Sequence, residues 1–358
     1  MRARVVIGAN FGDEGKGLVT DYLCATEGAG MVVRFNGGAQ AGHTVVTPAG
    51  DRHVFHHFGS GTLAGVPTFL SQFFICNPLV ALKEADQLLD MNYHPTLYAH
   101  PNCLVTTFAD MMINQMREDR RGDKRHGSVG VGIHETIRRS DIPELKITMS
   151  DLWNNISLEK RLYEICGKYA EYRTGKKIDH PDAMIHNFMK FCELFASSVN
   201  PLGIQQCPDP VFEGAQGLLL DQDNKEFFPH LTHSKTGMYN VRMLCQQANI
   251  KDIDTYYVSR TYLTRHGAGK LPGEDVSMKF VDNTNNEHPY QGKLRFAPLD
   301  WDSLVSRCIK DAGVGKFKIV LTHCDQLPPP TLAEADLYAY GPTRTRFTKE
   351  KAEVMLSV

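Results

Sequence analysis

The stretch Gly8-Ala9-Asn10-Phe11-Gly12-Asp13-Glu14-Gly15-Lys16-Gly17 decides the fold that this sequence predicts. It follows an apolar strand candidate, Val5–Ile7, and precedes a helical pattern with apolar residues on one side, Leu18–Leu23. A strand, a glycine-rich turn and a helix start in this order aim backbone N–H groups and the positive helix end at one place, where an anion can bind. Lys16 adds a point charge suited to a terminal phosphate. The spacing matches neither G-x-x-x-x-G-K-[ST] nor G-x-G-x-x-G, and an ordinary glycine turn is the alternative interpretation.

A second glycine-rich loop, Asn36–Thr44 (NGGAQAGHT), follows another apolar strand candidate, 31–35. Its glycines allow the backbone to approach a ligand closely, and His43 lies where the next strand begins. His43 can donate to a phosphoryl oxygen or a developing oxyanion, although a lone histidine is more often structural. In the first loop, Asp13 and Glu14 would repel phosphate, so an acidic residue there suits metal binding or proton transfer.

These two loops resemble those of adenylosuccinate synthetase, the ligase that joins aspartate to a 6-oxopurine nucleotide. Further segments resemble family motifs in the same order: 212–221 (FEGAQG-x-LLD), 228–232, 264–274 (family TRVGAG-x-x-P-x-E), 321–325 (family T-K-x-D) and 341–345 (GP-x-RT). The resemblance implies an α/β fold, a single large domain over residues 1–358 whose mostly parallel central sheet is flanked by helices. Because the chain is shorter than usual for the family, we expect the peripheral helices to be trimmed.

Apolar runs and composition refine this expectation. Buried strands are predicted near 5–8, 31–35, 74–76, 210–213, 255–263 and 317–322. Amphipathic helices are predicted at 152–169 and 183–198, within a helical insertion that spans 152–198. A mobile loop on the aspartate side is predicted at 276–292. With 39 basic and 41 acidic residues, the chain gives no support for a nucleic-acid partner. Nine scattered cysteines without metal-finger spacing indicate reduced thiols. No apolar run approaches membrane-spanning length. We therefore expect a cytoplasmic protein without a membrane partner, in the host cytoplasm if the chain is viral.

The resemblance also implies residue roles. The catalytic residues would be Asp13, which takes the N1 proton of the purine, together with Lys16, His43 and Gln216. Mg²⁺ would be held by the Asp13 carboxylate and the Gly42 carbonyl. The acceptor nucleotide and aspartate would contact Asn10, Ser128, Gly130, Arg138, Gln216, Thr232, Lys293 and Arg295. The donor nucleotide would contact Gly12, Glu14, Gly15, Lys16, Gly17, Gly42, Thr44, Arg265, Thr322, Asp325, Gly341 and Pro342.

The chain departs from the family motifs in its substrate-facing loops. Val129 replaces a threonine of the phosphate loop, and Gln40 replaces an asparagine. The arginine-rich run G-R-R-R-R-T-G-W is reduced to 292–298, in which Arg295 is left to grip the aspartate carboxylate and Lys293 is a weaker substitute. His323 replaces the lysine of T-K-x-D. The resemblance further implies a homodimer in which Arg138 or Arg139 completes the neighbouring site.

These departures favour a changed substrate within an unchanged reaction. In length and altered loops the chain is similar to the short bacteriophage branch, which uses dGMP and leads to 2-aminoadenine nucleotides. (d)GMP is therefore the expected acceptor. IMP is the alternative, because some viral members of the family replace the loop aspartate whereas this chain keeps Asp13. The donor would be ATP, dATP or GTP. A nucleotide-binding regulator without turnover is the alternative of another class.

Overall fold

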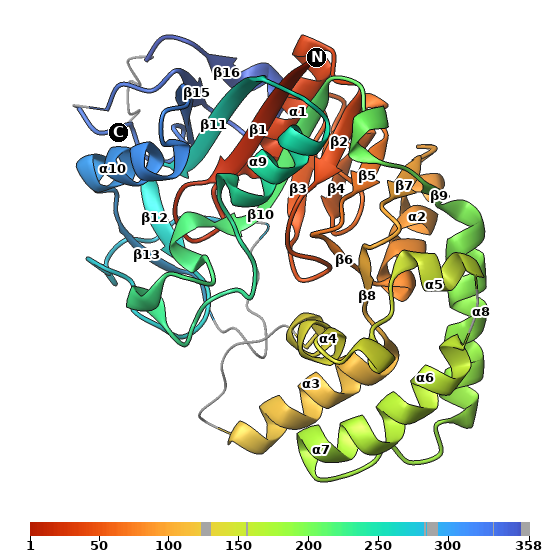
Figure 1. Cartoon of the computed structure of the whole chain (residues 1–358). Coiled ribbons are helices and arrows are strands. Elements are labelled where there is room, and N and C mark those ends of the chain that lie inside the picture. The colour runs from red at the N-terminus through yellow and green to blue at the C-terminus, as the bar shows by residue number, and fades with distance from the viewer. Residues whose placement is uncertain (123–129, 155–156, 283, 285–292, 332, 352–358) are drawn as a thin grey trace.

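A ten-stranded sheet runs through the computed structural model, which describes residues 1–122, 130–154, 157–282, 284, 293–331 and 333–351 (Figure 1). The strand order is β16-β15-β14-β11-β1-β10-β2-β5-β7-β9, and every neighbouring pair is parallel except β15 and β16. The strands are β1 Arg2–Gly8, β2 Met31–Arg34, β5 Thr68–Leu70, β7 Leu97–Ala99, β9 Asn200–Pro201, β10 Pro210–Gly217, β11 Asp252–Arg260, β14 Phe317–Thr322, β15 Leu337–Ala339 and β16 Phe347–Thr348. The predicted mostly parallel α/β architecture is confirmed.

The apolar runs form the centre of this sheet. In β1, Val5, Val6 and Ile7 are fully buried, as expected of a parallel strand covered on both faces. Val6 is in register with Glu213 of β10 and Tyr256 of β11. Two predicted strands need correction. The strand expected at 255–263 ends at Arg260, and the one at 74–76 is only Ile75–Cys76, outside the main sheet. The short strands β5, β7 and β9 were not predicted.

Three two-stranded pairs accompany the main sheet. They are the antiparallel pair β3 His43–Val46 and β4 Arg52–Phe55, the parallel pair β6 Ile75–Cys76 and β8 Leu104–Val105, and the antiparallel pair β12 Tyr262–Arg265 and β13 Arg295–Pro298. Short 3₁₀ turns lie at Thr62–Ala64, Pro143–Leu145, Ile204–Gln206, Leu218–Leu220, Lys225–Phe227 and Arg344–Arg346. The pairs β3–β4 and β12–β13 matter most for function, because they carry His43 and the turn after Arg265.

The helices form two groups (Figure 1). Beside the sheet lie α1 Lys16–Glu27, α2 Pro78–Asp90, α9 Met238–Gln247 and α10 Trp301–Ala312. A helical lobe contains α3 Phe108–Arg121, α4 Ile133–Ser140, α5 Met149–Asn154, α6 Leu158–Glu164, α7 Ala170–Thr174 and α8 Asp182–Ser198. The helix predicted at 183–198 is confirmed by α8. The helix predicted at 152–169 is wrong as a single element, because α5 ends at Asn154, α6 begins at Leu158, and a π-helical turn follows at Ile165–Tyr169.

All nine cysteines are buried and free. Within the described ranges, no helix combines the length and the apolar character needed to cross a bilayer.

A buried arginine joins α3, α4 and the strand β8 within and beside the helical lobe. Arg139 on α4 and Asp110 on α3 are both fully buried, with Nε–Oδ1 at 2.9 Å and Nη2–Oδ2 at 3.0 Å. Arg139 also donates to the carbonyls of Val105 and Leu145. Arg139 therefore cannot reach a neighbouring subunit, and that half of the predicted Arg138-or-Arg139 alternative is wrong. Arg138 has a side chain 56% exposed, 3.6 Å from Asp141.

Replacing Arg139 should destabilise the lobe strongly. Arg139→Met leaves the Asp110 carboxylate buried without its cation, so we expect a loss of about 3–5 kcal/mol in the free energy of unfolding. The matched variant Arg138→Met should change it by less than about 0.5 kcal/mol. Urea unfolding followed by circular dichroism measures both. Equal midpoints for the two variants would contradict this account of α4.

Candidate active site

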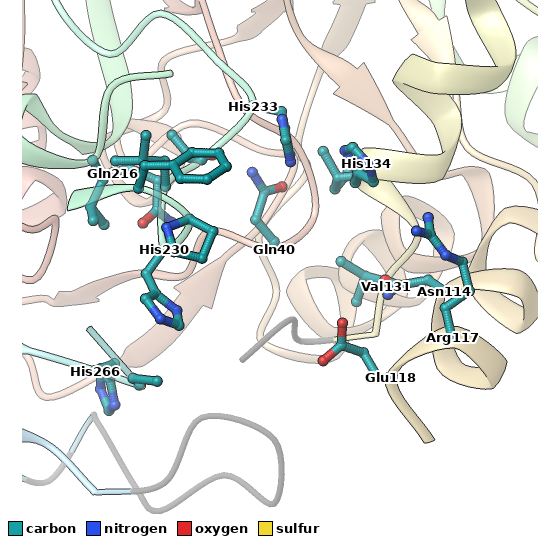
Figure 2. A pocket seen from close by; sticks show the side chains of 18 of the residues that line it. Gln40, Asn114, Arg117, Glu118, Val131, His134, Gln216, His230, His233 and His266 are labelled. Carbon is teal, nitrogen blue, oxygen red and sulfur yellow. The ribbon is translucent and has the colours of Figure 1, made fainter. Parts of the chain in front are cut away.

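The glycine loops border two pockets, and the helical lobe lines the larger one. The glycine-loop pocket has a volume of about 150 Å³ and is lined by Gly12, Asp13, Gly15, Lys16, Gly17, Leu18, Gly42, His43, Thr44, Val46, Arg260, Asp282, Thr284, His323 and Pro342. The large pocket, about 440 Å³, is lined by Gln40, Asn114, Arg117, Glu118, Arg121, Val131, Ile133, His134, Glu135, Gln216, Leu220, Phe228, Pro229, His230, Leu231, Thr232, His233, Arg265, His266, Gly267 and Ala268 (Figure 2). The first and second glycine loops thus come together, as predicted.

The first glycine loop is closed by one of its own carboxylates. Glu14 is buried, and its Oε1 accepts from the amides of Gly12 (2.7 Å) and Asn10 (3.2 Å). Lys16 Nζ donates to the Gly12 carbonyl at 2.6 Å and lies 3.5 Å from Glu14 Oε2. Burial raises the pKa of Glu14 above its ordinary value. Its side chain lines neither pocket and shapes the loop, and the contact of Glu14 with the donor stays a prediction.

The carboxyl ends of the neighbouring strands β14 and β11 support this loop through hydrogen bonds. Thr322 is buried and its Oγ1 donates to the Glu14 carbonyl at 2.8 Å. Asn10 is also buried, donating from Nδ2 to Ser259 (2.9 Å) and accepting at Oδ1 from Arg307 (2.5 Å). Both residues support the loop and neither lines a pocket, so their contacts with the donor and the acceptor stay predictions.

His43 is oriented by the buried carboxylate of Glu213, a residue to which the sequence motifs assigned no role. Its Nδ1 lies 2.7 Å from Oε1 of Glu213, whose Oε2 accepts from the Ser60 amide at 3.0 Å. Burial lowers the pKa of His43 to about 4, whereas His43 and Arg34 help to lower the pKa of Glu213 to about 2. His43 Nε2 is buried without a partner among the described residues. Because His43 lines the glycine-loop pocket, this nitrogen is the group available to a phosphoryl oxygen.

Arg260 is a second residue that the sequence analysis missed. It is buried, it lines the glycine-loop pocket, its Nε donates to the Asp13 carbonyl at 2.5 Å, and its Nη2 lies 2.9 Å from Asp282 Oδ2. Asp282 belongs to the segment predicted as a mobile loop at 276–292, of which 283 and 285–292 lie outside the described residues. A charged residue at the end of a buried strand was the available signal. Arg260 fixes the backbone of Asp13 and leaves the Asp13 side chain, 27% exposed, on the pocket wall.

In the large pocket, Gln216 and Thr232 come together as predicted. Arg265 also lines the large pocket and does not line the glycine-loop pocket, and its contact with the donor stays a prediction. The buried Arg265 guanidinium packs against the rings of Phe11 and Phe227, 4.7 and 5.2 Å from their centroids, and the two rings contact each other edge to face. Burial lowers the pKa of Arg265 to about 10.

Arg295 does not present a free fork for a substrate carboxylate. Its Nη1 lies 2.7 Å from Glu274 Oε2, and its Nη2 donates to the carbonyls of Gly267 (2.8 Å) and Gly269 (2.7 Å). Glu274 compensates the Arg295 charge in this structure, and the aspartate clamp stays a prediction, in which a substrate carboxylate would have to replace Glu274. The remaining predicted contacts that line neither pocket are Gly130, Arg138, Lys293, Asp325 and Gly341. Ser128 lies outside the described residues.

Histidines are the unpredicted feature of the large pocket. His134, His230, His233 and His266 line it (Figure 2). The rings of His134 and His233 stack at 3.9 Å with an interplanar angle of 33°. Burial, with His233 adding to it, lowers the pKa of His134 to about 4, so this ring is neutral at pH 7. The signal in the sequence was that His266 occupies the position of the valine in the family motif TRVGAG.

Known proteins resemble this chain along most of its length. A family model described as adenylosuccinate synthetase matches residues 5–295. The adenylosuccinate synthetases of Pseudomonas fluorescens (strain SBW25) and Picosynechococcus sp. (strain ATCC 27264 / PCC 7002 / PR-6) are 29% and 32% identical over 286 and 287 residues, 75% of this chain in each case. These alignments cover 65% and 62% of the two relatives, so the chain spans less than two thirds of their length.

Two solved structures share the fold. The fully ligated adenylosuccinate synthetase from Plasmodium falciparum has a TM-score of 0.71 and 20% identity, covering 95% of this chain and 80% of that one. The cyanophage S-2L succinoaminodeoxyadenylate synthetase (PurZ), bound to dGMP and to dATP as an energy donor, has a TM-score of 0.64 and 15% identity, covering 97% and 95%. At these identities the likeness establishes the architecture.

His323 should make stability depend on pH. Burial, with the charge of Arg260 adding to it, lowers the pKa of His323 from 6.5 to about 3. The unfolded chain therefore binds more protons between these values, and stability falls as the pH drops through that window. His323 has φ of 59°, which asparagine tolerates, so His323→Asn keeps the backbone and removes the titration. Between pH 7 and pH 5, wild type should lose about 1–2 kcal/mol more than His323→Asn.

Urea unfolding at the two pH values measures this difference. Other buried groups titrate equally in both proteins, so the variant serves as the control for them. An equal loss in the two proteins would show that His323 carries a proton in the folded state.

Proposed function

This chain belongs to the adenylosuccinate synthetase family, and on that premise we propose that it is a C–N ligase that joins L-aspartate to C6 of a 6-oxopurine 5′-nucleotide. A nucleoside triphosphate is converted to the diphosphate and phosphate in the process, through a 6-phosphoryl intermediate. One observation carries the proposal: a glycine-loop pocket with Lys16 and His43 adjoins a large pocket with Gln216 and Thr232, and Asp13 stands beside the boundary.

The chemistry requires such a pair of pockets. The 6-oxo group is a poor leaving group, and phosphorylation of O6 turns it into one that an amine can displace. Asp13, placed on the pocket wall with its backbone held by Arg260, is suited to take the N1 proton, which makes O6 nucleophilic. Lys16 and the free Nε2 of His43 are placed to contact the phosphoryl group and the leaving diphosphate.

The residues present fit a magnesium-bound donor. The Asp13 carboxylate and Gly42 line the same pocket and offer oxygen ligands, which Mg²⁺ prefers. Among the described residues, no group of three or more His, Cys, Asp or Glu side chains forms a metal cage. This agrees with Mg²⁺ being shared between one carboxylate and substrate phosphates. When bound, the ion would neutralise phosphate charge.

For the acceptor, we propose (d)GMP, with IMP as the alternative. Gln40, which stands where the family motif has asparagine, lines the large pocket, and its Oε1 is buried without a partner among the described residues. An unpaired oxygen there can accept from the exocyclic amino group of guanine, which hypoxanthine lacks. The cyanophage enzyme bound to dGMP matches this chain in length as well as fold. The curated relatives and the retained Asp13 support IMP.

The donor site supports a relaxed preference between ATP, dATP and GTP. Asp325, one of the predicted donor contacts, is exposed and lines neither pocket, whereas His323 and Pro342 line the glycine-loop pocket. A neutral imidazole can stack on either purine, so discrimination should be weak. The homodimer also belongs to the proposal, with the exposed Arg138 as the residue that reaches the neighbouring site.

A substrate matrix tests the reaction. IMP, GMP and dGMP are crossed with ATP, dATP and GTP in the presence of aspartate, with phosphate release and product mass as readouts. We expect aspartate-dependent turnover of GMP or dGMP, at least as fast with ATP as with GTP. Exclusive use of IMP would establish the alternative acceptor, and phosphate release without aspartate adduct would indicate the regulator.

Asp13→Asn tests the proton acceptor. It keeps the size of the side chain and removes the base, so activity should fall by about three orders of magnitude. The melting temperature should stay near that of wild type because the side chain is partly exposed. Near-normal turnover in this variant would refute the assignment.

Mixed dimers test Arg138. Arg138→Ala and Asp13→Asn subunits, each inactive, should regain about a quarter of wild-type activity after mixing, because each mixed dimer contains one intact site. Full activity of Arg138→Ala alone would contradict its role.

A further inference from the structure

Asp13 and His266 stand where the two pockets meet. Asp13 lines the glycine-loop pocket and His266 lines the large pocket, and the distance from His266 Nε2 to Asp13 Oδ2 is 3.9 Å. Of the basic side chains that the structure describes, His266 is the one within 4 Å of this carboxylate. A phosphoryl group that passes from a donor in one pocket to an acceptor in the other must cross this boundary. The pair therefore stands beside the reacting atoms.

The position of His266 is fixed by its neighbours. Arg265 directly precedes His266 and packs against the rings of Phe11 and Phe227. It also donates to the carbonyls of Lys270 (2.5 Å) and His230 (3.0 Å). Arg295 donates to the carbonyls of Gly267 and Gly269, which follow His266 in the sequence. Two arginines thus hold both sides of this turn. Figure 2 shows His266 on the same side of the large pocket as His230 and Gln216.

The imidazole has one donor to offer the carboxylate. In the neutral tautomer protonated at Nε2, that N–H faces Asp13 and Nδ1 is an acceptor. Nδ1 is buried without a partner among the described residues, so nothing described there competes for this tautomer. A separation of 3.9 Å is too long for a hydrogen bond, but contacts of this kind tighten when substrate binds. The valine of the family motif TRVGAG has no donor at this position.

We propose that His266 is a positioning residue of this chain: its imidazole holds the Asp13 carboxylate in the orientation that takes the N1 proton of the acceptor base. The inference rests on the proposed function, and it deepens it by naming a group that acts on Asp13. The effect belongs to the first chemical step, before aspartate enters. Binding of either nucleotide does not require it.

Positional isotope exchange in the donor triphosphate isolates that step. With acceptor nucleotide, Mg²⁺ and no aspartate, reversible transfer to O6 scrambles the β,γ-bridging oxygen label. His266→Val, which restores the motif residue, should slow the exchange about 30- to 100-fold while the KM of each nucleotide changes less than about threefold. His266→Gln, which keeps an N–H donor, should recover to within about tenfold of wild type. His186→Val, on the exposed face of α8, is the control.

Two results would overturn the inference. One is exchange at the wild-type rate in His266→Val. The other is an equal loss in the valine and glutamine variants together with a raised nucleotide KM, which indicates a binding or folding role. Melting temperatures of all variants separate folding from chemistry. Absence of exchange and turnover in wild type on every acceptor tested would overturn the proposed function itself.

Discussion

The buried carboxylate of Glu213 is the charge around which the functional edge of the sheet is assembled. It lies in the middle of β10 and is fully buried, so it is stable only if cations and donors surround it. His43 at 2.7 Å, the Ser60 amide at 3.0 Å and Arg34 Nε at 3.9 Å meet that need from three different segments. The same contacts leave His43 Nε2 facing the glycine-loop pocket. The need to compensate the Glu213 charge therefore determines both the conformation of the second loop and the direction of His43 Nε2.

The first loop solves a related problem with its own side chains. Two acidic residues in an anion-binding turn look contradictory in the sequence, yet they point to different places. Glu14 turns inward and satisfies two loop amides, which gives the turn its shape without a ligand. Asp13 faces the pocket, where a carboxylate has chemistry to perform. Because Glu14 already accepts from the amides of Gly12 and Asn10, these two amides are not available to a phosphate. Under the proposed function, phosphate binding therefore depends on Lys16 and on a bound cation.

The sequence predicts the central strands and the two glycine loops because local patterns encode them. Long apolar runs produced β1, β2, β10, β11 and β14, whereas β7 and β9 are too short to carry a pattern of their own. The guanidinium groups were placed less well. A motif shows that an arginine is present but not which carboxylate already compensates it, and both Arg139 and Arg295 are bound by acids distant in sequence, Asp110 and Glu274.

The departures from the family motifs fall in both pockets, and their cost depends on the charges around them. His323 in the glycine-loop pocket and Gln40 in the large pocket are both neutral side chains. The buried charges of the glycine-loop pocket compensate one another, so replacing one member leaves its partner uncompensated at a cost of several kcal/mol. The large pocket combines charged side chains such as Arg117 and Glu135 with neutral hydrogen-bonding groups such as Gln40. Neutral groups can be exchanged without leaving an uncompensated charge, and each exchange alters which base edge is satisfied. Under the proposed function, a change of acceptor nucleotide therefore needs exchanges only among the neutral groups, and His266 lies on the boundary between the two pockets.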